Sequence, residues 1–167
     1  MTEQLSPLAL QALAIVEESG AIISANHAHP HTIRHKGRID LVTETDIAVE
    51  AFLKERLATL TPEAGFLAEE SAEDLSLPDT CWIIDPVDGT TNFAHGLPLT
   101  VTSVAYRLNG EIVLGIVNAP LLRECFIAEK GKGAWRNGER ISVSSVAACE
   151  NALVSTGFPY EIARRVD

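Results

Sequence analysis

The sequence predicts an α+β domain in which two N-terminal helices pack on an antiparallel sheet. Apolar residues recur at helical spacing up to about residue 60, and from Phe66 onward the pattern changes to short apolar runs separated by turn residues. Two Asn-Gly pairs, at 109–110 and 137–138, are strong signals for tight hairpin turns. Helices followed by hairpin-connected strands are typical of a layered α+β domain.

The first helix is expected over about 6 to 24, because Ser6 suits an N-cap and Pro7 suits the first helical position. Gly20 and the polar stretch after Ile23 favour its end.

The second helix is expected from about 44 to 59. Thr43 and Asp46 have capping-box spacing ahead of an apolar periodicity. Glu50 and Lys54 lie four positions apart, which favours an ion pair along the helix.

The sheet is expected to contain two hairpins. Asn109-Gly110 joins two apolar runs into one hairpin, and Asn137-Gly138 follows the other. The paired runs are Val101–Leu108 with Glu111–Val117, and Arg123–Glu129 with Gly133–Arg136. Alternate uncharged residues of the first hairpin predict a face that a further domain or another subunit covers: Val101, Ser103, Ala105, Val113, Gly115 and Val117.

Composition excludes several classes of function. The chain has 167 residues, enough for one domain with a substantial core, and a formal net charge of -10, which argues against nucleic acid and anionic membranes as partners. Its three cysteines are odd in number and widely spaced, which predicts reduced, mostly buried thiols. No export signal or uninterrupted apolar run of about 18 residues is present, so we expect a cytoplasmic protein with no membrane span.

The most informative segment is an apolar strand that runs into two acids, a glycine and two hydroxyls, Cys81–Phe93. Asp85, Asp88 and the main-chain carbonyl of Val87 offer hard oxygen ligands, which favour magnesium, manganese or calcium over zinc. A helix that begins at Thr90 and Thr91 would direct free N–H groups at an anion. For D-x-x-D-G alone, the competing interpretation is an ordinary Asp-Gly turn.

The whole string resembles the signature of the inositol monophosphatase family, magnesium-dependent and lithium-sensitive phosphatases of inositol and sugar phosphates. Three further stretches are similar to family segments: Asp40–Asp46, Phe66–Ser71 and Gly131–Gly138. Thr156–Tyr160 is similar to the segment that opens the next part of the family fold. Ala68 departs from the pattern, since many members have glycine there.

The resemblance implies a role for each polar residue of the segment. Metal ligands would be Glu69, Asp85, the Val87 carbonyl and Asp88. Catalytic residues would be Glu69 and Thr90, which orient the attacking water, and Asp46, which holds metal-bound waters or a third cation. The substrate would be bound by Asp88, Gly89, Thr90 and Thr91. Glu70 and Lys36 would contact the metal ligands without binding the metal themselves.

Plainer interpretations stay open for the residues outside the signature. Residues 69–74 would also suit a solvated acidic loop, Asp46 a helix cap, and Lys36 an exposed loop charge. The histidines of 27–35 invite a zinc or nickel interpretation, but the absence of acid or cysteine partners at ligand spacing favours a flexible loop. Trp82 and Trp135 are expected in the core.

The resemblance also bounds the domains. Residues 1–145 correspond to the N-terminal α+β metal-binding domain of an αβαβα layered fold, and 146–167 to the start of a C-terminal α/β domain. Family members continue with a Trp-Asp segment whose aspartate completes the metal site, and none follows Tyr160 here. We therefore expect either a fragment of a longer protein or a shortened relative.

The expected function is a Mg²⁺-dependent phosphomonoesterase that uses two or three ions, with Mn²⁺ as a substitute, and that hydrolyses an inositol monophosphate by direct water attack. Alternatives within the superfamily are fructose-1,6-bisphosphate, histidinol phosphate and nucleotide bisphosphate phosphatases. From another class, an inactive relative could act as an interaction subunit; a calcium-binding module lacks EF-hand spacing. The resemblance also implies a homodimer.

Overall fold

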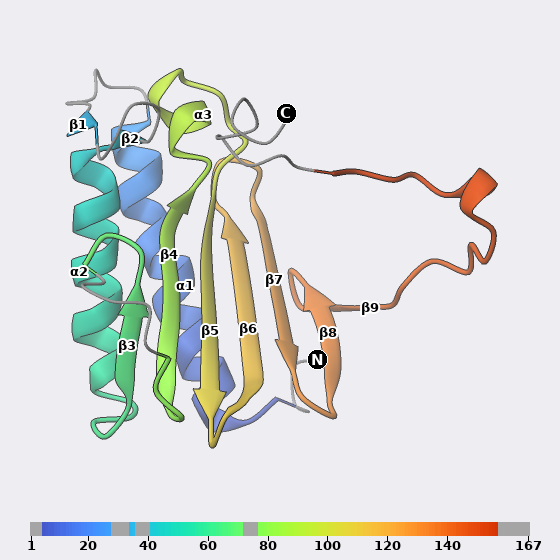
Figure 1. The fold of residues 1–167 in the computed structure, drawn as a ribbon, viewed down its shortest axis with the longest axis horizontal. Coiled ribbons are helices and arrows are strands. Elements are labelled where there is room, and N and C mark those ends of the chain that lie inside the picture. Colours follow the sequence, from blue (N-terminus) through green and yellow to red (C-terminus); the bar gives the residue numbers. More distant parts are fainter. Residues whose placement is uncertain (1–4, 28–33, 36–40, 72–76, 157–167) are drawn as a thin grey trace, which may run out of the picture.

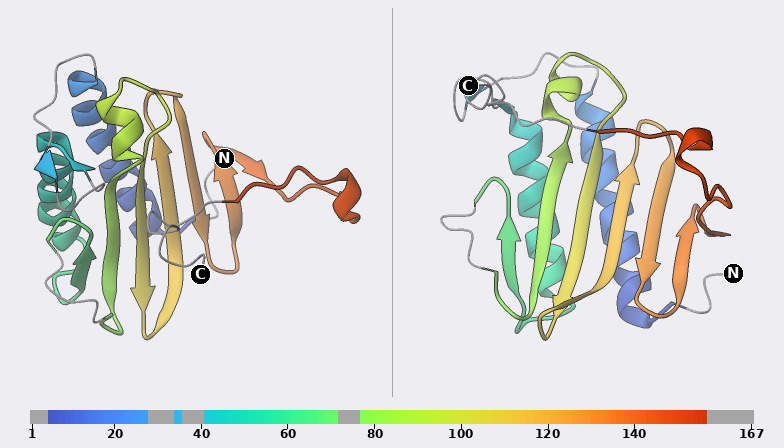
Figure 2. Two further views of the ribbon diagram at one scale, coloured as in Figure 1. Left: turned by 45° about the horizontal axis from the view of Figure 1, so that its top comes forward. Right: turned by 45° about the vertical axis from the view of Figure 1, so that its right-hand side comes forward.

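The computed structural model describes residues 5–27, 34–35, 41–71 and 77–156. Two helices, α1 (Pro7–Asn26) and α2 (Glu44–Ala58), lie side by side on one face of a seven-stranded sheet (Figure 1). The views of Figure 2 show both helices on the same face of the sheet. Among the described residues, no helix covers the opposite face. The prediction of an α+β domain with two N-terminal helices is confirmed.

The sheet has the strand order β3-β4-β5-β6-β7-β8-β9. Its strands are β3 (Gly65–Ala68), β4 (Cys81–Asp88), β5 (Val101–Leu108), β6 (Glu111–Ala119), β7 (Glu124–Glu129), β8 (Gly133–Arg136) and β9 (Glu139–Ile141). Two short strands, β1 (Arg34–His35) and β2 (Leu41–Val42), form a separate antiparallel pair before α2. A short helix, α3 (Thr90–Ala94), follows β4 at the end of the sheet, and a 3₁₀ turn covers Cys149–Asn151.

One strand pair departs from the expected antiparallel sheet. β3 pairs with β4 in parallel register, Gly65 with Cys81 and Ala68 with Ile84, while every other neighbouring pair in the sheet is antiparallel. Because parallel strands run the same way, the residues that follow β3 and the last residues of β4 lie at the same end of the sheet. This pairing brings the acidic segment after Ala68 beside Asp85.

Local sequence accounts for the ends of both helices. The Ser6 hydroxyl accepts a hydrogen bond from the Ala9 N–H, with Pro7 at the first position of α1. Thr43 and Asp46 form the predicted capping box at α2. Both predicted starts are therefore confirmed, and α1 extends two residues further than the predicted end at 24, to Asn26.

Both predicted hairpins form, and both Asn-Gly pairs make tight turns. Asn109 and Gly110 both have positive φ, as do Asn137 and Gly138, which is the backbone that tight turns between twisted strands require. β5 pairs with β6 and β7 with β8, and the second Asn-Gly turn leads into β9.

The core lies between the helices and the inner face of the sheet. Trp82 is fully buried, donates its indole N–H to the Thr61 hydroxyl at 2.8 Å and stacks on Tyr106 with 4.5 Å between ring centroids. Trp135 is also buried, so both tryptophans lie in the core as predicted. Of the three cysteines, Cys81 and Cys125 are buried and Cys149 is exposed.

Helix α1 is long and apolar enough to cross a membrane, by length and composition alone. The sequence pattern does not indicate it, because its apolar run is interrupted. In the structure its apolar residues are used for core packing. Ala12, Val16 and Ile23 are fully buried, and the helix contacts α2, β5, β6 and β7.

The opposite face of the sheet is open within the part of the chain that the structure describes. Thr102, Val104 and Tyr106 point to the helices, so the alternate residues Ser103 and Ala105 lie on the outer face and are half-buried. The prediction that this face is covered by a further partner or domain stays a prediction. The chain leaves the sheet beyond β9, projects away from it as far as the 3₁₀ turn at Cys149–Asn151, and then runs back toward the sheet (Figure 1). The predicted domain boundary near 145 stays a prediction.

Candidate metal and phosphate site

A bulge near the end of β4 shapes the main chain of the signature segment. Asp85 pairs with Ser103 and Asp88 with Val101, so two residues, Pro86 and Val87, oppose the single residue between them on β5. Pro86 has no N–H to donate to the ladder, which favours a bulge at this position. The strand therefore changes direction between its two acids.

Two buried threonines fix this bulge, Thr102 in β5 and Thr100 just before it. The Thr102 hydroxyl donates to the Pro86 carbonyl at 2.9 Å, and the Thr100 hydroxyl donates to the Asp88 carbonyl at 2.9 Å. The carbonyls on either side of Val87 are thus engaged on the β5 side. The Val87 carbonyl instead lies 2.9 Å from the Thr90 hydroxyl.

Asp46 joins the start of α2 to the same corner. Its Oδ2 accepts hydrogen bonds from the Thr43 N–H and hydroxyl, and its Oδ1 lies 3.0 Å from the Thr90 hydroxyl. The side chain is 1% exposed. Asp46 therefore caps the helix and contacts Thr90 with different oxygens, so the capping and site interpretations hold together.

The Thr90 hydroxyl lies within hydrogen-bond distance of two acceptors, Asp46 Oδ1 and the Val87 carbonyl. A hydroxyl carries one proton, so it can donate to only one of them at a time. When Thr90 donates to Asp46, the Val87 carbonyl is available to a cation, and the lone pairs of the Thr90 oxygen can accept a hydrogen bond from another group.

Three carboxylates, those of Glu69, Asp88 and Asp46, interact with Asp85. Burial and the negative charges of Glu69, Asp88 and Asp46 raise the pKa of Asp85 to about 8, and a hydrogen bond with Glu69 contributes. In the absence of a cation Asp85 therefore keeps its proton to a higher pH than an ordinary aspartate. Asp85 Oδ1 is buried and has no hydrogen-bond partner among the described residues.

These residues fit a hard divalent cation. A cation would neutralise the mutual repulsion and give the orphaned Asp85 Oδ1 a ligand, and all the donors are oxygens. Among the described residues no three acid, histidine or cysteine side chains converge into a preformed cage. Magnesium usually keeps several waters and uses one or two carboxylates, so such a cage is not required.

The short helix α3 begins directly at this corner. Its N-cap is Gly89, which is in the left-handed conformation and has no side chain to cap the helix. The N–H groups of its first turn, which includes Thr90 and Thr91, therefore have no side-chain acceptor from the cap position.

The other predicted site residues are placed as follows. Glu69 follows β3 with its side chain largely exposed, and its N–H donates to the Ile84 carbonyl at 3.1 Å. Glu70 contacts α2 through its main-chain N–H, which donates to Glu50 at 2.9 Å. Asp88 and Thr91 are exposed. Lys36 and His29–His31 lie outside the described residues.

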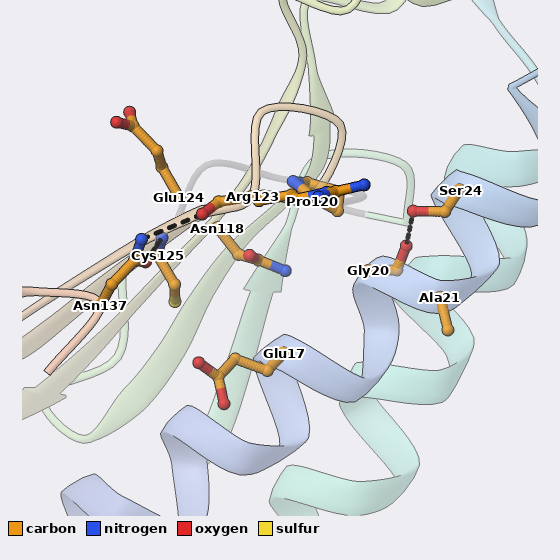
Figure 3. Close-up of a pocket in the computed structure, with 10 residues that line it drawn as sticks. All are labelled: Glu17, Gly20, Ala21, Ser24, Asn118, Pro120, Arg123, Glu124, Cys125 and Asn137. Atoms are coloured by element: carbon orange, nitrogen blue, oxygen red, sulfur yellow. Dashed lines mark hydrogen bonds between the residues drawn. The ribbon is translucent and has the colours of Figure 1, made fainter.

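A separate cavity of about 350 Å³ lies between α1 and the strands β6 and β7 (Figure 3). Glu17 and Gly20 of α1 face Asn118, Arg123 and the start of β7. None of the interacting carboxylates lines this cavity. It is therefore distinct from the candidate site.

Removing the hydroxyls of Thr100 and Thr102 tests the bulge. Thr100→Val and Thr102→Val would each leave a main-chain carbonyl without its donor, and we expect each to lower the free energy of unfolding by about 1–3 kcal/mol. Ser103→Ala, which follows Thr102 and lies on the outer face, is the control and should change the free energy of unfolding by less than about 0.5 kcal/mol. Equal losses of stability in the two valine variants and in Ser103→Ala, measured by urea denaturation, would contradict a role of the two hydroxyls in fixing the bulge.

Gly89 cannot take a side chain without strain. Its φ is +89°, and a Cβ would lie 2.8 Å from the Leu99 carbonyl oxygen. Gly89→Ala is expected to cost about 1–2 kcal/mol for the backbone conformation, plus the clash. Gly96→Ala, at φ +72° with nothing within 4 Å of the new Cβ, shows the conformational cost alone. If urea denaturation gives similar free energies of unfolding for the two variants, the backbone at Leu99 moves away from the new Cβ at no cost in stability.

Comparison with known proteins agrees with the geometry. Residues 4–166 match the inositol monophosphatase family. An inositol monophosphatase of Dictyostelium discoideum is 44% identical over 154 residues, which are 90% of this chain and 57% of that protein. A fructose-1,6-bisphosphatase/inositol-1-monophosphatase of Thermotoga maritima is 46% identical over 118 residues, 71% of this chain and 45% of its own length.

Solved structures share the fold. The suhB protein of Bartonella henselae superimposes with a TM-score of 0.77 at 33% identity, covering 84% of this chain and 55% of that one. An IMPase/NADP phosphatase complexed with Mg²⁺ and phosphate gives 0.68 at 28% identity, covering 76% and 49%. The chain thus spans about half the length of these relatives. By sequence and by fold, it belongs to the inositol monophosphatase family.

Proposed function

We propose that this protein is a Mg²⁺-dependent phosphomonoesterase. The observation that carries the proposal is the group of interacting carboxylates around Asp85, placed beside the uncapped start of α3. Such a corner offers oxygens to a cation and N–H groups to a phosphate at the same time. The family relationship supports hydrolysis of a phosphate ester.

Glu69, Asp85, Asp88 and the Val87 carbonyl would hold the cations, two or three Mg²⁺ ions for which Mn²⁺ would substitute. Divalent ions supply charge compensation on the phosphate and make a bound water acidic. The structural relative complexed with Mg²⁺ and phosphate supports this choice of ion. Asp85 would then release its own proton and bind the metal.

Thr90 would take the proton of the attacking water and pass its own proton to Asp46. Thr90 can accept a proton on its oxygen while it donates its own to Asp46 Oδ1, 3.0 Å away. Asp46 is held in place for this by Thr43. Water would attack phosphorus directly, so the P–O bond to the alcohol breaks as the new P–O bond forms, with no phosphoenzyme.

Gly89, Thr90 and Thr91 would bind the phosphate through N–H groups at the start of α3, with Asp88 beside the substrate. The preferred substrate is an inositol monophosphate. Fructose-1,6-bisphosphate is the first alternative, because the Thermotoga relative carries both activities in its name. We also propose lithium inhibition, a homodimer and a cytoplasmic location.

A second candidate function is an interaction subunit without activity. The observation that favours it is the open outer face of the sheet, where the uncharged residues of β5 and β6 lie side by side in register, Ala105 opposite Gly115 and Ser103 opposite Val117.

Phosphate release by the 167-residue chain tests both candidates. Inositol 1-phosphate, fructose-1,6-bisphosphate, histidinol phosphate and a nucleotide bisphosphate would each be offered with Mg²⁺, with Mn²⁺ and with chelator. We expect metal-dependent release that is fastest from inositol 1-phosphate. No release from any ester by a folded chain would contradict a phosphatase activity of this chain and favour the interaction subunit.

A further inference from the structure

Three charged side chains of α2 form a stripe with a spacing of four residues: Asp46, Glu50 and Lys54. Residues four apart lie on the same side of a helix, so the stripe runs along one line of α2. Asp46 is 1% exposed and Glu50 is 5% exposed. Acidic side chains are rarely buried to this extent unless they are paired or hydrogen-bonded.

The contacts of Glu50 explain its burial. Its Oε2 accepts a hydrogen bond of 2.9 Å from the main-chain N–H of Glu70. Its Oε1 lies 3.9 Å from Lys54 Nζ, and Lys54 also donates to the Ser71 hydroxyl at 2.9 Å. The helix therefore holds two consecutive residues of the turn that follows Glu69.

The other side of this turn is fixed by the sheet. The Glu69 N–H donates to the Ile84 carbonyl at 3.1 Å, one residue before Asp85, and the Ser71 N–H donates to the Ala68 carbonyl at 3.3 Å. Glu69 thus lies between an anchor on β4 and an anchor on α2. Its backbone is held close to Asp85, with which its side chain shares a hydrogen bond.

From this geometry we infer that Glu50 is a positioning residue, whose buried carboxylate holds Glu69 in place for the divalent cation. The same helix carries Asp46 one turn earlier, so α2 fixes the positions of Asp46 and Glu69 relative to each other. The inference rests on the proposed function only in that Glu69 binds the metal.

Calorimetric titration of the chain with Mn²⁺ tests the inference without any substrate. Removing the residue that orients a ligand typically weakens metal binding about 10- to 100-fold, and we expect this for Glu50→Ala. In Glu50→Gln the amide oxygen can still accept from Glu70, so its affinity should stay within about 3-fold of wild type.

Two control variants separate positioning from stability and charge. Glu55→Ala removes an exposed acid of the same helix, and Leu57→Ala removes a fully buried side chain. Both should bind Mn²⁺ as wild type does, although Leu57→Ala should melt at a lower temperature. If Glu50→Ala melts lower than wild type but binds Mn²⁺ with unchanged affinity, Glu50 is only structural and the inference is wrong.

Two further outcomes would overturn it. A Glu50→Gln variant as impaired as Glu50→Ala would assign the effect to charge and not to the hydrogen bond. If Glu50→Ala does not fold, hydrogen exchange of the wild-type chain decides: the Glu70 amide should be protected before metal is added, and rapid exchange there would contradict the contact. Absence of Mn²⁺ binding by wild type would instead count against the proposed function.

Discussion

Asp88→Asn is expected to lower Mg²⁺-dependent phosphate release from inositol 1-phosphate by roughly a thousandfold, because metal-ion stabilisation is worth several kcal/mol and each 1.36 kcal/mol is a factor of ten. Asp88 is exposed at the end of β4, so an uncharged isostere there should preserve the fold while removing a ligand oxygen. The measurement is the rate of phosphate release at saturating substrate and Mg²⁺.

The matched control is Asp79→Asn. Asp79 lies just before the start of β4, its side chain is 88% exposed, and it lies 3.9 Å from Arg107. An exposed ion pair of this kind contributes about 0–1 kcal/mol to stability, so the control should keep wild-type release. An Asp88→Asn variant as active as Asp79→Asn would remove Asp88 from the site.

Local sequence predicted those parts of the fold that local interactions decide. The capping box of Thr43 and Asp46 and the turns at Asn109-Gly110 and Asn137-Gly138 each depend on a few neighbouring residues. The parallel pairing of β3 with β4 was missed, because Gly65–Ala68 indicates a strand but carries no information on its direction. Direction depends on the path of the connection between the two strands.

The candidate site shows the same division. Asp85, Asp88 and Thr90 stand together in one motif. Thr102 in β5 and Thr100 just before it donate to main-chain carbonyls of β4, and no sequence pattern indicates these contacts. Pro86 within an apolar strand was the available signal for a bulge. Glu50 was interpreted as the helical partner of Lys54, and its burial against Glu70 could not be predicted from spacing alone.

Asp85→Asn is expected to stabilise the metal-free protein at pH 8, although it removes a ligand. In the folded chain the pKa of Asp85 is raised from 3.8 to about 8, by burial and by the charges around it, so the folded state binds this proton more tightly than the unfolded state. Stability from this group is therefore present below about pH 4 and is lost as the pH rises to about 8. Asparagine cannot ionise, so the variant should lack this loss.

Thermal unfolding from pH 4 to pH 9 with chelator, then with Mg²⁺, separates the two effects. Without metal, the wild-type midpoint should fall across this window while that of Asp85→Asn falls less, and at pH 8 the variant should be the more stable. With Mg²⁺ the order should reverse, because a cation that binds only the folded state raises the wild-type midpoint and the variant has lost a ligand. Asp79→Asn should follow wild type throughout. Parallel profiles for wild type and Asp85→Asn would mean that the carboxylates around Asp85 do not repel one another. The metal proposal would then lose its main physical support, since it is this repulsion that a divalent cation would relieve.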